Sequence, residues 1–184
     1  MSDSNFLLEA LQEFERKVVE AAKSNLQKKN KNVSGKLDDS IKGEVKVMPN
    51  SIRVFFEMDN YGWFQDQGVK GVKSGSSLSN FSYKSKGGKR GLKGMPPPSA
   101  FDKWGIRKPI KGIRDKKTGK FLKRKSINFL IARSVFHHGI KASMFFTKPF
   151  EKQFKQLPEE LIEKYGLDME NLLVSIIDES LKNK

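Results

Sequence analysis

The chain has 184 residues and carries 36 Lys and Arg against 21 Asp and Glu, which gives a formal net charge of +15 at pH 7. This length predicts one domain, or one domain that carries a large insertion. Cysteine is absent, which excludes disulfide scaffolds and thiol nucleophiles, and no apolar run approaches the ~18 residues that would span a bilayer.

Residues 4–28 predict an amphipathic helix. Apolar side chains recur there at spacings of three and four, so they fall on one stripe, whereas charged side chains occupy the opposite side. We expect the stripe to face the core. It consists of Leu7, Leu11, Phe14, Val18, Ala22 and Leu26.

Two strands are predicted next, after a short element with a glycine hinge at residues 33–41. Residues 44–48 and 51–58 flank Pro49-Asn50, a turn-forming pair. Alternate side chains of the second run, from Ile52 to Met58, are apolar, which is the period of a half-buried strand. The two runs therefore predict a β-hairpin.

The composition changes between residues 68 and 125. This segment holds 18 Lys and Arg but only Asp102 and Asp115, a net charge of +16, so the rest of the chain sums to about −1. The segment is also rich in Gly, Ser and Pro, and residues 87–91 and 95–98 exclude regular secondary structure. Residues 112–122 predict a β-hairpin with a glycine in its turn.

Helical patterns return at Ser126, a predicted N-cap, and Gly139 stands where that helix would end. Thr147, as an N-cap, and Pro149 predict a second helix start, and Asp168 predicts a third. The apolar stripe of the first of these helices is Ile127, Leu130, Ile131 and Val135, and that of the third is Leu172, Leu173, Ile176, Ile177 and Leu181.

These elements predict an α+β fold: an N-terminal amphipathic helix, a small antiparallel β-sheet with a long basic insertion, and C-terminal helices. We expect a single domain over residues 1–184, with residues 68–125 as an extended insertion that leaves the compact domain, and a peripheral helix at residues 166–184. In the predicted core, Leu7, Leu11, Phe14 and Val18 pack on Ile52, Val54 and Phe56, with Leu130 and Phe150 closing it.

No group of residues predicts catalysis. The two histidines, His137 and His138, are adjacent, and neighbours diverge by ~100° on a helix, so they cannot chelate one metal; a structural role near a helix end is favoured. The doublets Asp38-Asp39 and Glu159-Glu160 lack a partner cluster for acid–base chemistry, and no phosphate-binding loop is present. We therefore expect no catalytic, cofactor or metal site; a small hydrolase is a competing hypothesis.

The basic segment allows two interpretations. Dense cations interleaved with aromatic residues are typical of nucleic-acid contact, and the excess of lysine favours the DNA backbone over base reading. Alternatively, self-repulsion keeps the segment extended until it packs on neighbouring subunits. Candidate contacts with DNA or a neighbour are Lys84, Lys86, Lys89, Arg90, Lys93, Arg107, Lys108, Arg114, Lys116 and Lys117, and candidate anchors between subunits are Phe81, Tyr83, Trp104 and Phe121.

Four sequence elements come in a recognisable order. The N-terminal amphipathic helix is followed by residues 34–41 (Ser-Gly-Lys-Leu-Asp-Asp-Ser-Ile) and residues 61–68 (Tyr-Gly-Trp-Phe-Gln-Asp-Gln-Gly). Residues 139–150 (Gly-Ile-Lys-Ala-Ser-Met-Phe-Phe-Thr-Lys-Pro-Phe) then precede a helix. This order resembles the tail-completion or head–tail joining (neck) proteins of tailed double-stranded DNA bacteriophages.

In that family the corresponding elements are Thr/Ser-Gly-x-Leu-x-x-Ser, a Tyr-x-x-x-x-(Glu)-x-Gly strand end, and aromatic-aromatic-x-x-Pro/Ala. Here Asp66 or Gln67 stands where an acidic residue is common. The resemblance covers residues 1–68 and 126–157, and neither the basic insertion nor the tail after Gly166 has a counterpart.

The resemblance implies a structural virion protein of the neck or upper tail, made in the host cytoplasm. Such a protein forms a homo-oligomeric ring, sixfold on a tail or twelvefold beneath a portal. It contacts neighbouring connector, portal and tail proteins, and it lets DNA pass without a cofactor, an enzymatic activity or a membrane. The alternative is a free, non-sequence-specific nucleic-acid-binding protein.

Overall fold

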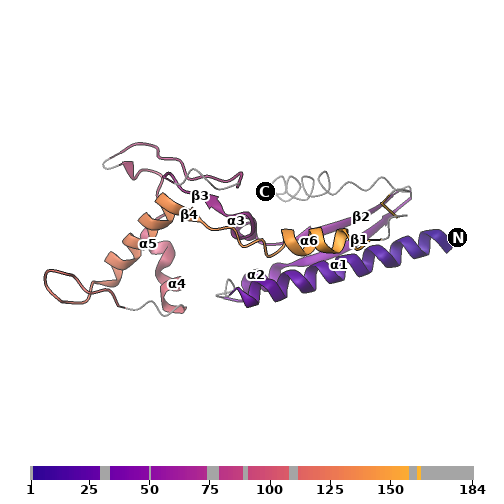
Figure 1. Ribbon diagram of the computed structural model, residues 1–184, viewed down its shortest axis with the longest axis horizontal. Coiled ribbons are helices and arrows are strands. Elements are labelled where there is room, and N and C mark those ends of the chain that lie inside the picture. Colours follow the sequence, from indigo (N-terminus) through magenta and orange to yellow (C-terminus); the bar gives the residue numbers. More distant parts are fainter. Residues whose placement is uncertain are drawn as a thin grey trace. The chain divides into compact units, whose positions relative to one another are not determined.

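The computed structural model describes residues 2–29, 34–49, 51–73, 79–88, 91–107, 112–157 and 161–162 (Figure 1). The fold is α+β, as predicted. The chain divides into two compact units: a first unit of residues 1–66 and 144–184, and a second unit of residues 67–143. The second unit therefore continues beyond residue 125, where the basic insertion was expected to end.

The first unit begins with α1 (Ser2–Lys28), which lies along a hairpin of β1 (Lys42–Met48) and β2 (Ser51–Glu57) (Figure 1). The predicted stripe of this helix, from Leu7 to Leu26, is buried at all six positions. The short helix α2 (Lys36–Ser40) follows the left-handed Gly35 and buries Leu37. The amphipathic pattern of the sequence thus correctly identified both the helix and its core face.

The hairpin is antiparallel, with Lys42 opposite Glu57 and Met48 opposite Ser51. Its first strand begins two residues before the predicted start at residue 44, and its second ends one residue before the predicted end at residue 58. Along β2, Phe56 is buried and its neighbour Glu57 is exposed, in keeping with the predicted alternation.

Aromatic rings join the hairpin to α1 and to α6 (Thr147–Phe154). The centroid of the Phe14 ring lies 6.1 Å from that of Phe56 and 5.4 Å from that of Phe150, both in edge-to-face geometry. This arrangement places the positive edge of one ring against the negative face of another. The predicted packing of Phe14, Phe56 and Phe150 is confirmed, but the predicted role of Leu130 is wrong, because that side chain is exposed and belongs to the second unit.

Residues 61–67 form helix α3 (Tyr61–Gln67) rather than the strand end that the family resemblance implied. Trp63 and Asp66 point into the interior and are buried, and the Trp63 ring meets Phe146 edge-to-face at 5.6 Å. A Cβ at Gly62 would lie 2.6 Å from Met58 Sδ and 2.9 Å from Leu37 Cδ1. A larger residue at that position would therefore require the Met58 and Leu37 side chains to shift.

The second unit is built on main-chain pairing between β3 (Val69–Lys70) and β4 (Gly139–Ile140). Lys70 also bonds through its main chain to Phe81 and Tyr83, both at 2.8 Å. Gly139 adopts φ +79°, and a Cβ there would lie 1.9 Å from the Val69 carbonyl oxygen. This glycine both ends a helix, as predicted, and allows the two strands to approach.

The principal helix of the second unit is α5 (Arg124–His138). Its buried residues are Asn128, Ala132 and Phe136, which recur every four positions. The predicted core stripe is wrong, because Leu130 is exposed and the other three members, Ile127, Ile131 and Val135, are only half-buried. The inner face of α5 therefore combines a polar, a small and an aromatic residue.

Two predicted N-caps are also wrong. Helix α5 starts before Ser126, since the Ser126 and Ile127 amides already donate to the Lys123 carbonyl at 2.9 and 3.2 Å. Thr147 is the first residue of α6 and not its cap, because the carboxylate of Asp66 takes that role.

Among the described residues, the second unit also contains a 3-10 helix, η2 (Pro98–Phe101), and helix α4 (Asp102–Arg107). Residues 112–122 fold back as predicted, with an antiparallel bridge between Arg114 and Phe121. The helix expected from Asp168 lies outside the described residues, as does the peripheral helix expected at residues 166–184.

Candidate nucleic-acid interface

Positive charge is concentrated in the second unit. Residues 67–143 contain 20 Lys and Arg and two Asp, a net charge of +18, whereas the rest of the chain has a net charge of −3. The charge asymmetry seen in the sequence therefore coincides with a structural division. A surface of this kind attracts polyanions regardless of their sequence.

The two carboxylates of the second unit are engaged by N–H donors. Asp115 Oδ1 accepts hydrogen bonds from the Lys117 amide at 2.8 Å and the Thr118 amide at 3.0 Å. The Thr118 amide, followed by that of Lys117, lowers the pKa of Asp115. Asp102 accepts a hydrogen bond from the side-chain amide of Asn128.

Ion pairs do not offset this charge within the part of the chain that the structure describes. The pairs found there join Arg16 to Glu20, Lys17 to Glu13 and Lys46 to Glu44, all in the first unit. The described cations of the second unit consequently remain available to an external anion.

The basic hairpin, residues 112–122, presents the densest group of these cations. Asp115 accepts the amides of its turn, and main-chain bonds of 2.8 Å join Asp115 to Lys120 and Leu122 to Ile113. Lys116, Lys117 and Lys120 are exposed. The turn is thus ordered by its single acid, while its lysines point to solvent.

An aromatic side chain lies beside these lysines. The Arg114 guanidinium lies over the Phe121 ring, 4.5 Å from its centroid, and Phe121 is 63% exposed. Stacking fixes the planar guanidinium on the hairpin surface and leaves its N–H edge free to meet phosphate oxygens. An exposed ring beside cations is also a feature of surfaces that bind nucleic acid.

The cations continue into the first turn of α5, where Lys123 is the N-cap residue and Arg124 and Lys125 follow. This turn has no acidic residue and no side-chain cap hydrogen bond. A helix N-terminus already carries a partial positive charge, so cations there are electrostatically unfavourable for the helix itself. Their presence adds to the positive potential of the hairpin.

Six of the ten predicted contact residues lie in two described turns. Lys84, Lys86 and Lys93 are exposed in a loop closed by bonds of 2.8 Å from Lys86 N to Lys93 O and 2.9 Å from Lys93 N to Gly87 O. Arg114, Lys116 and Lys117 lie in the basic hairpin. Lys89, Arg90, Lys108 and the side chain of Arg107 lie outside the described residues.

Within residues 112–125, the candidate set omitted four cations: Lys120, Lys123, Arg124 and Lys125. They follow the predicted hairpin without interruption, so counting charge through to the next helix would have included them. Their location beside Arg114, Lys116 and Lys117 along the chain makes residues 112–125 the most basic described surface segment.

The predicted anchors differ in their surroundings. Tyr83 packs edge-on against Phe136 of the same unit, with ring centroids 6.0 Å apart, and burial raises the pKa of its hydroxyl. Phe81 is half-buried beside β3, whereas Phe121 is largely exposed. The side chain of Trp104 lies outside the described residues. An anchoring role between subunits stays a prediction for all four.

A buried carboxylate joins two of the elements that carry the family resemblance. Asp66 Oδ1 accepts hydrogen bonds from the amides of Phe146 at 2.7 Å and Thr147 at 3.3 Å, and Oδ2 accepts one from the Thr147 hydroxyl. The Asp66 carbonyl also accepts the Met144 amide at 2.9 Å. Asp66 therefore caps α6 from 80 residues away, which is a structural role.

Possible catalytic groups are dispersed. His137 and His138 end α5, and the pKa of His137 is lowered first by burial and then by Lys73 and Arg133. The described residues include no group of three His, Asp or Glu side chains placed to hold a metal ion.

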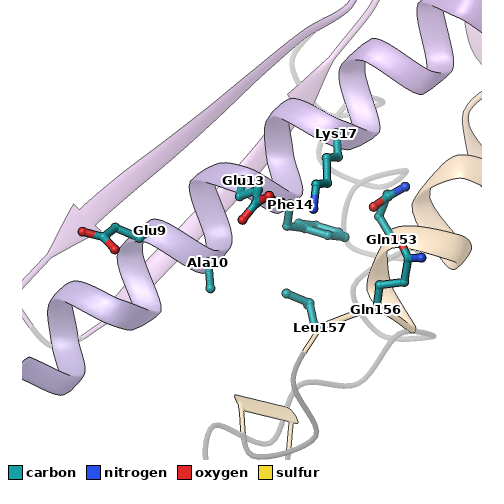
Figure 2. Close-up of a pocket in the computed structure, with 8 residues that line it drawn as sticks. All are labelled: Glu9, Ala10, Glu13, Phe14, Lys17, Gln153, Gln156 and Leu157. Atoms are coloured by element: carbon teal, nitrogen blue, oxygen red, sulfur yellow. Dashed lines mark ion pairs between the residues drawn. The ribbon is translucent and has the colours of Figure 1, made fainter.

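The first unit has a pocket of about 290 Å³ beside α1 (Figure 2). It contains the Lys17–Glu13 ion pair, with a 2.7 Å separation of Nζ and Oε1. Its other charged lining residue is Glu9, and two glutamines supply its remaining polar groups. No nucleophile is paired with a base here. The lining residues are Glu9, Ala10, Glu13, Phe14, Lys17, Gln153, Gln156 and Leu157.

None of the helices in the described ranges is both long enough and apolar enough to cross a membrane. Comparison with protein-family models, curated proteins and solved structures gives no match to this chain.

Proposed function

We propose that this protein is a structural virion protein of a tailed double-stranded DNA phage. In this proposal it is a ring-forming subunit of the head–tail connector, neck or tail-completion (tail-terminator) ring, which joins the capsid portal to the tail. The basic surface of the second unit faces the DNA backbone in the channel. The observation that carries the proposal is the contact of Asp66 with Phe146 and Thr147, which brings two of the family-like elements together.

This contact favours a structural protein because it assigns the most distinctive motif residues to folding. Trp63, Asp66 and Phe146 are all buried in the first unit, where they fix the start of α6. A family-like pattern carried by residues that stabilise the fold is in keeping with a structural subunit.

The division of charge supports the proposed contact with DNA. A ring subunit needs two different surfaces that meet head to tail, since closure of such contacts yields a cyclic oligomer. It also needs a surface that contacts the DNA without reading its sequence, so that the DNA can slide past the ring. The exposed side chains of Lys84, Lys86 and Lys93 and the exposed lysines of residues 112–125 suit this task because they neutralise phosphates as point charges.

Two measurements on the full-length protein test the assignment. Native mass spectrometry should detect a closed oligomer of six or twelve copies, and mass spectrometry of purified virions should detect the chain as a component. A protein that is monomeric at all accessible concentrations and absent from virions would contradict the proposal.

The second candidate is a free, non-sequence-specific nucleic-acid-binding protein, which the net charge of +18 on the second unit specifically favours. Under this alternative the isolated monomer binds duplex DNA with an affinity that falls steeply with salt. Under the ring proposal, tight binding requires the assembled ring, because only the ring surrounds the duplex with many copies of the basic surface.

The hairpin contribution can be isolated by charge removal. Replacing Lys116, Lys117 and Lys120 with glutamine should make the slope of log Kobs against log salt shallower by about 2–3, since each lost phosphate contact removes ~0.9. The matched control replaces three exposed lysines of the first unit and should leave the slope unchanged. The control positions are Lys28, Lys36 and Lys42.

A further inference from the structure

The second unit contains a groove of about 700 Å³ that adjoins the basic segment 112–125 and shares Leu122 and Lys125 with it. One side comes from η2 and the start of α4, and the other comes from the first half of α5 together with Leu122. The lining residues are Pro98, Ser99, Asp102, Leu122, Lys125, Ser126, Asn128, Phe129 and Leu130.

Large apolar side chains of this groove are open to solvent. Phe129 is 37% exposed and Leu130 is 41% exposed, although they are adjacent on α5. Leu130 belongs to the helical stripe that the sequence predicted as core, and the structure leaves that stripe incompletely covered. Contiguous exposed apolar side chains that line a groove are a feature of interaction surfaces.

The charged residues at the groove favour an occupant with acidic side chains. Lys125 lines the groove, and three further exposed cations stand next to lining residues along the chain: Lys103, Lys123 and Arg124. The one acid of the lining, Asp102, accepts a hydrogen bond from the side-chain amide of Asn128. The groove therefore fits an apolar surface flanked by acidic side chains. Complementary charges of this kind orient a partner and speed its association.

The sequence of this same chain contains a segment with that chemistry. Residues 168–181 carry an apolar stripe at helical spacing, and residues 159–181 contain seven Asp and Glu but a single Lys, Lys164. An amphipathic helix recognises a groove by placing such a stripe against it. The stripe residues are Leu172, Leu173, Ile176, Ile177 and Leu181.

We propose that residues 168–181 of a neighbouring copy dock as an amphipathic helix in the groove of the second unit. The choice of a neighbouring copy rests on the proposed ring. Each subunit offers one groove and one acidic segment, which is the head-to-tail arrangement that closes a ring. The acidic segment covers Phe129 and Leu130 and places its carboxylates toward the basic rim.

Because the chain has no cysteine, directed cross-linking of full-length chains can test this docking. Ser126→Cys introduces a thiol into the groove, and Ser180→Cys introduces one seven residues after Leu173, on the same helical side. When the two single variants are mixed and oxidised, we expect a disulfide between different chains. Ser82→Cys, which is exposed in the second unit but outside the groove lining, should cross-link at least tenfold less.

A second pair of variants tests whether the apolar contact drives the docking. Leu130→Glu in the Ser126→Cys chain should reduce the cross-linked product at least tenfold. Ile113→Glu changes a residue of the same unit that is 43% exposed and does not line the groove, so it should leave the yield unchanged. Circular dichroism would establish that both variants remain folded.

The docking is overturned if the Ser126→Cys and Ser180→Cys chains cross-link no better than the control. It is also overturned if a double variant closes its disulfide within one chain at a rate independent of concentration. Native mass spectrometry of the cysteine-free parent protein tests separately whether a closed ring forms. Rings without the cross-link overturn the docking alone, whereas cross-linked chains without a closed ring support the docking and overturn the proposed function.

Discussion

Replacing Asp66 with alanine would remove the acceptor that caps α6. The Phe146 and Thr147 amides and the Thr147 hydroxyl would lose their partner in a site where Asp66 is fully buried. A buried donor without a partner costs about 1–3 kcal/mol, and loss of an N-cap costs ~1 kcal/mol. Since these contributions overlap, we expect the free energy of unfolding to fall by about 2–4 kcal/mol.

Asp66→Asn keeps the shape and one oxygen acceptor, so its effect should be smaller, on the order of 1–2 kcal/mol. Asp39→Ala is the control, because Asp39 is an exposed acid near the start of α2, where substitution should cost less than about 0.5–1 kcal/mol.

Urea unfolding followed by the fluorescence of Trp63 measures this effect locally, because that ring lies 5.6 Å from Phe146. A Trp104→Phe background removes the other tryptophan of the chain from the signal. If Asp66→Ala destabilised the first unit no more than Asp39→Ala, the capping role would be refuted.

Three further outcomes follow from the structure. Phe14→Ala or Phe56→Ala should lower the free energy of unfolding by ~3–5 kcal/mol in a denaturant titration. The control Val47→Ala, at a 62% exposed position, should lower it by less than about 0.5 kcal/mol. A loss below ~1 kcal/mol for both phenylalanine variants would contradict the packing. Because hydrogen bonds lower the pKa of Asp115, its carboxylate should stabilise the basic hairpin fully above the unfolded-state pKa. This stabilisation should be lost as pH falls through the lower folded-state pKa. A carboxyl NMR titration that gives an ordinary or raised pKa would contradict this. Limited proteolysis of the free protein should cut first within residues 84–93 and more slowly after ring assembly, so equal resistance there and in α1 of the free protein would count against an exposed loop.

The first unit was largely predictable because each of its long elements has a single buried face. The stripe of α1 and the alternation in β2 identify those faces directly from periodicity. Periodicity failed to identify the buried face of helix α5, because the more apolar stripe of that helix, which includes Leu130, is not the buried one. Its inner face uses Ala132 for close approach and Asn128, whose polarity is satisfied by Asp102. Neither condition is visible before the chain is folded.

The candidate interface was predictable in charge but not in geometry. Counting Lys and Arg located the basic segment, whereas the stacking of Arg114 on Phe121 and the use of Asp115 within the turn required the structure. The role of Asp66 was hidden for a related reason, since its partners, Phe146 and Thr147, lie 80 and 81 residues away. A short motif does not reveal a tertiary cap.

Electron cryomicroscopy of the assembled protein tests the central claim most directly, because it reports both closure and the orientation of the subunits. The proposal predicts a closed ring of six or twelve copies in which residues 112–125 of every subunit face the central channel. A ring with this segment on its outer surface, or a preparation containing only monomers, would contradict it.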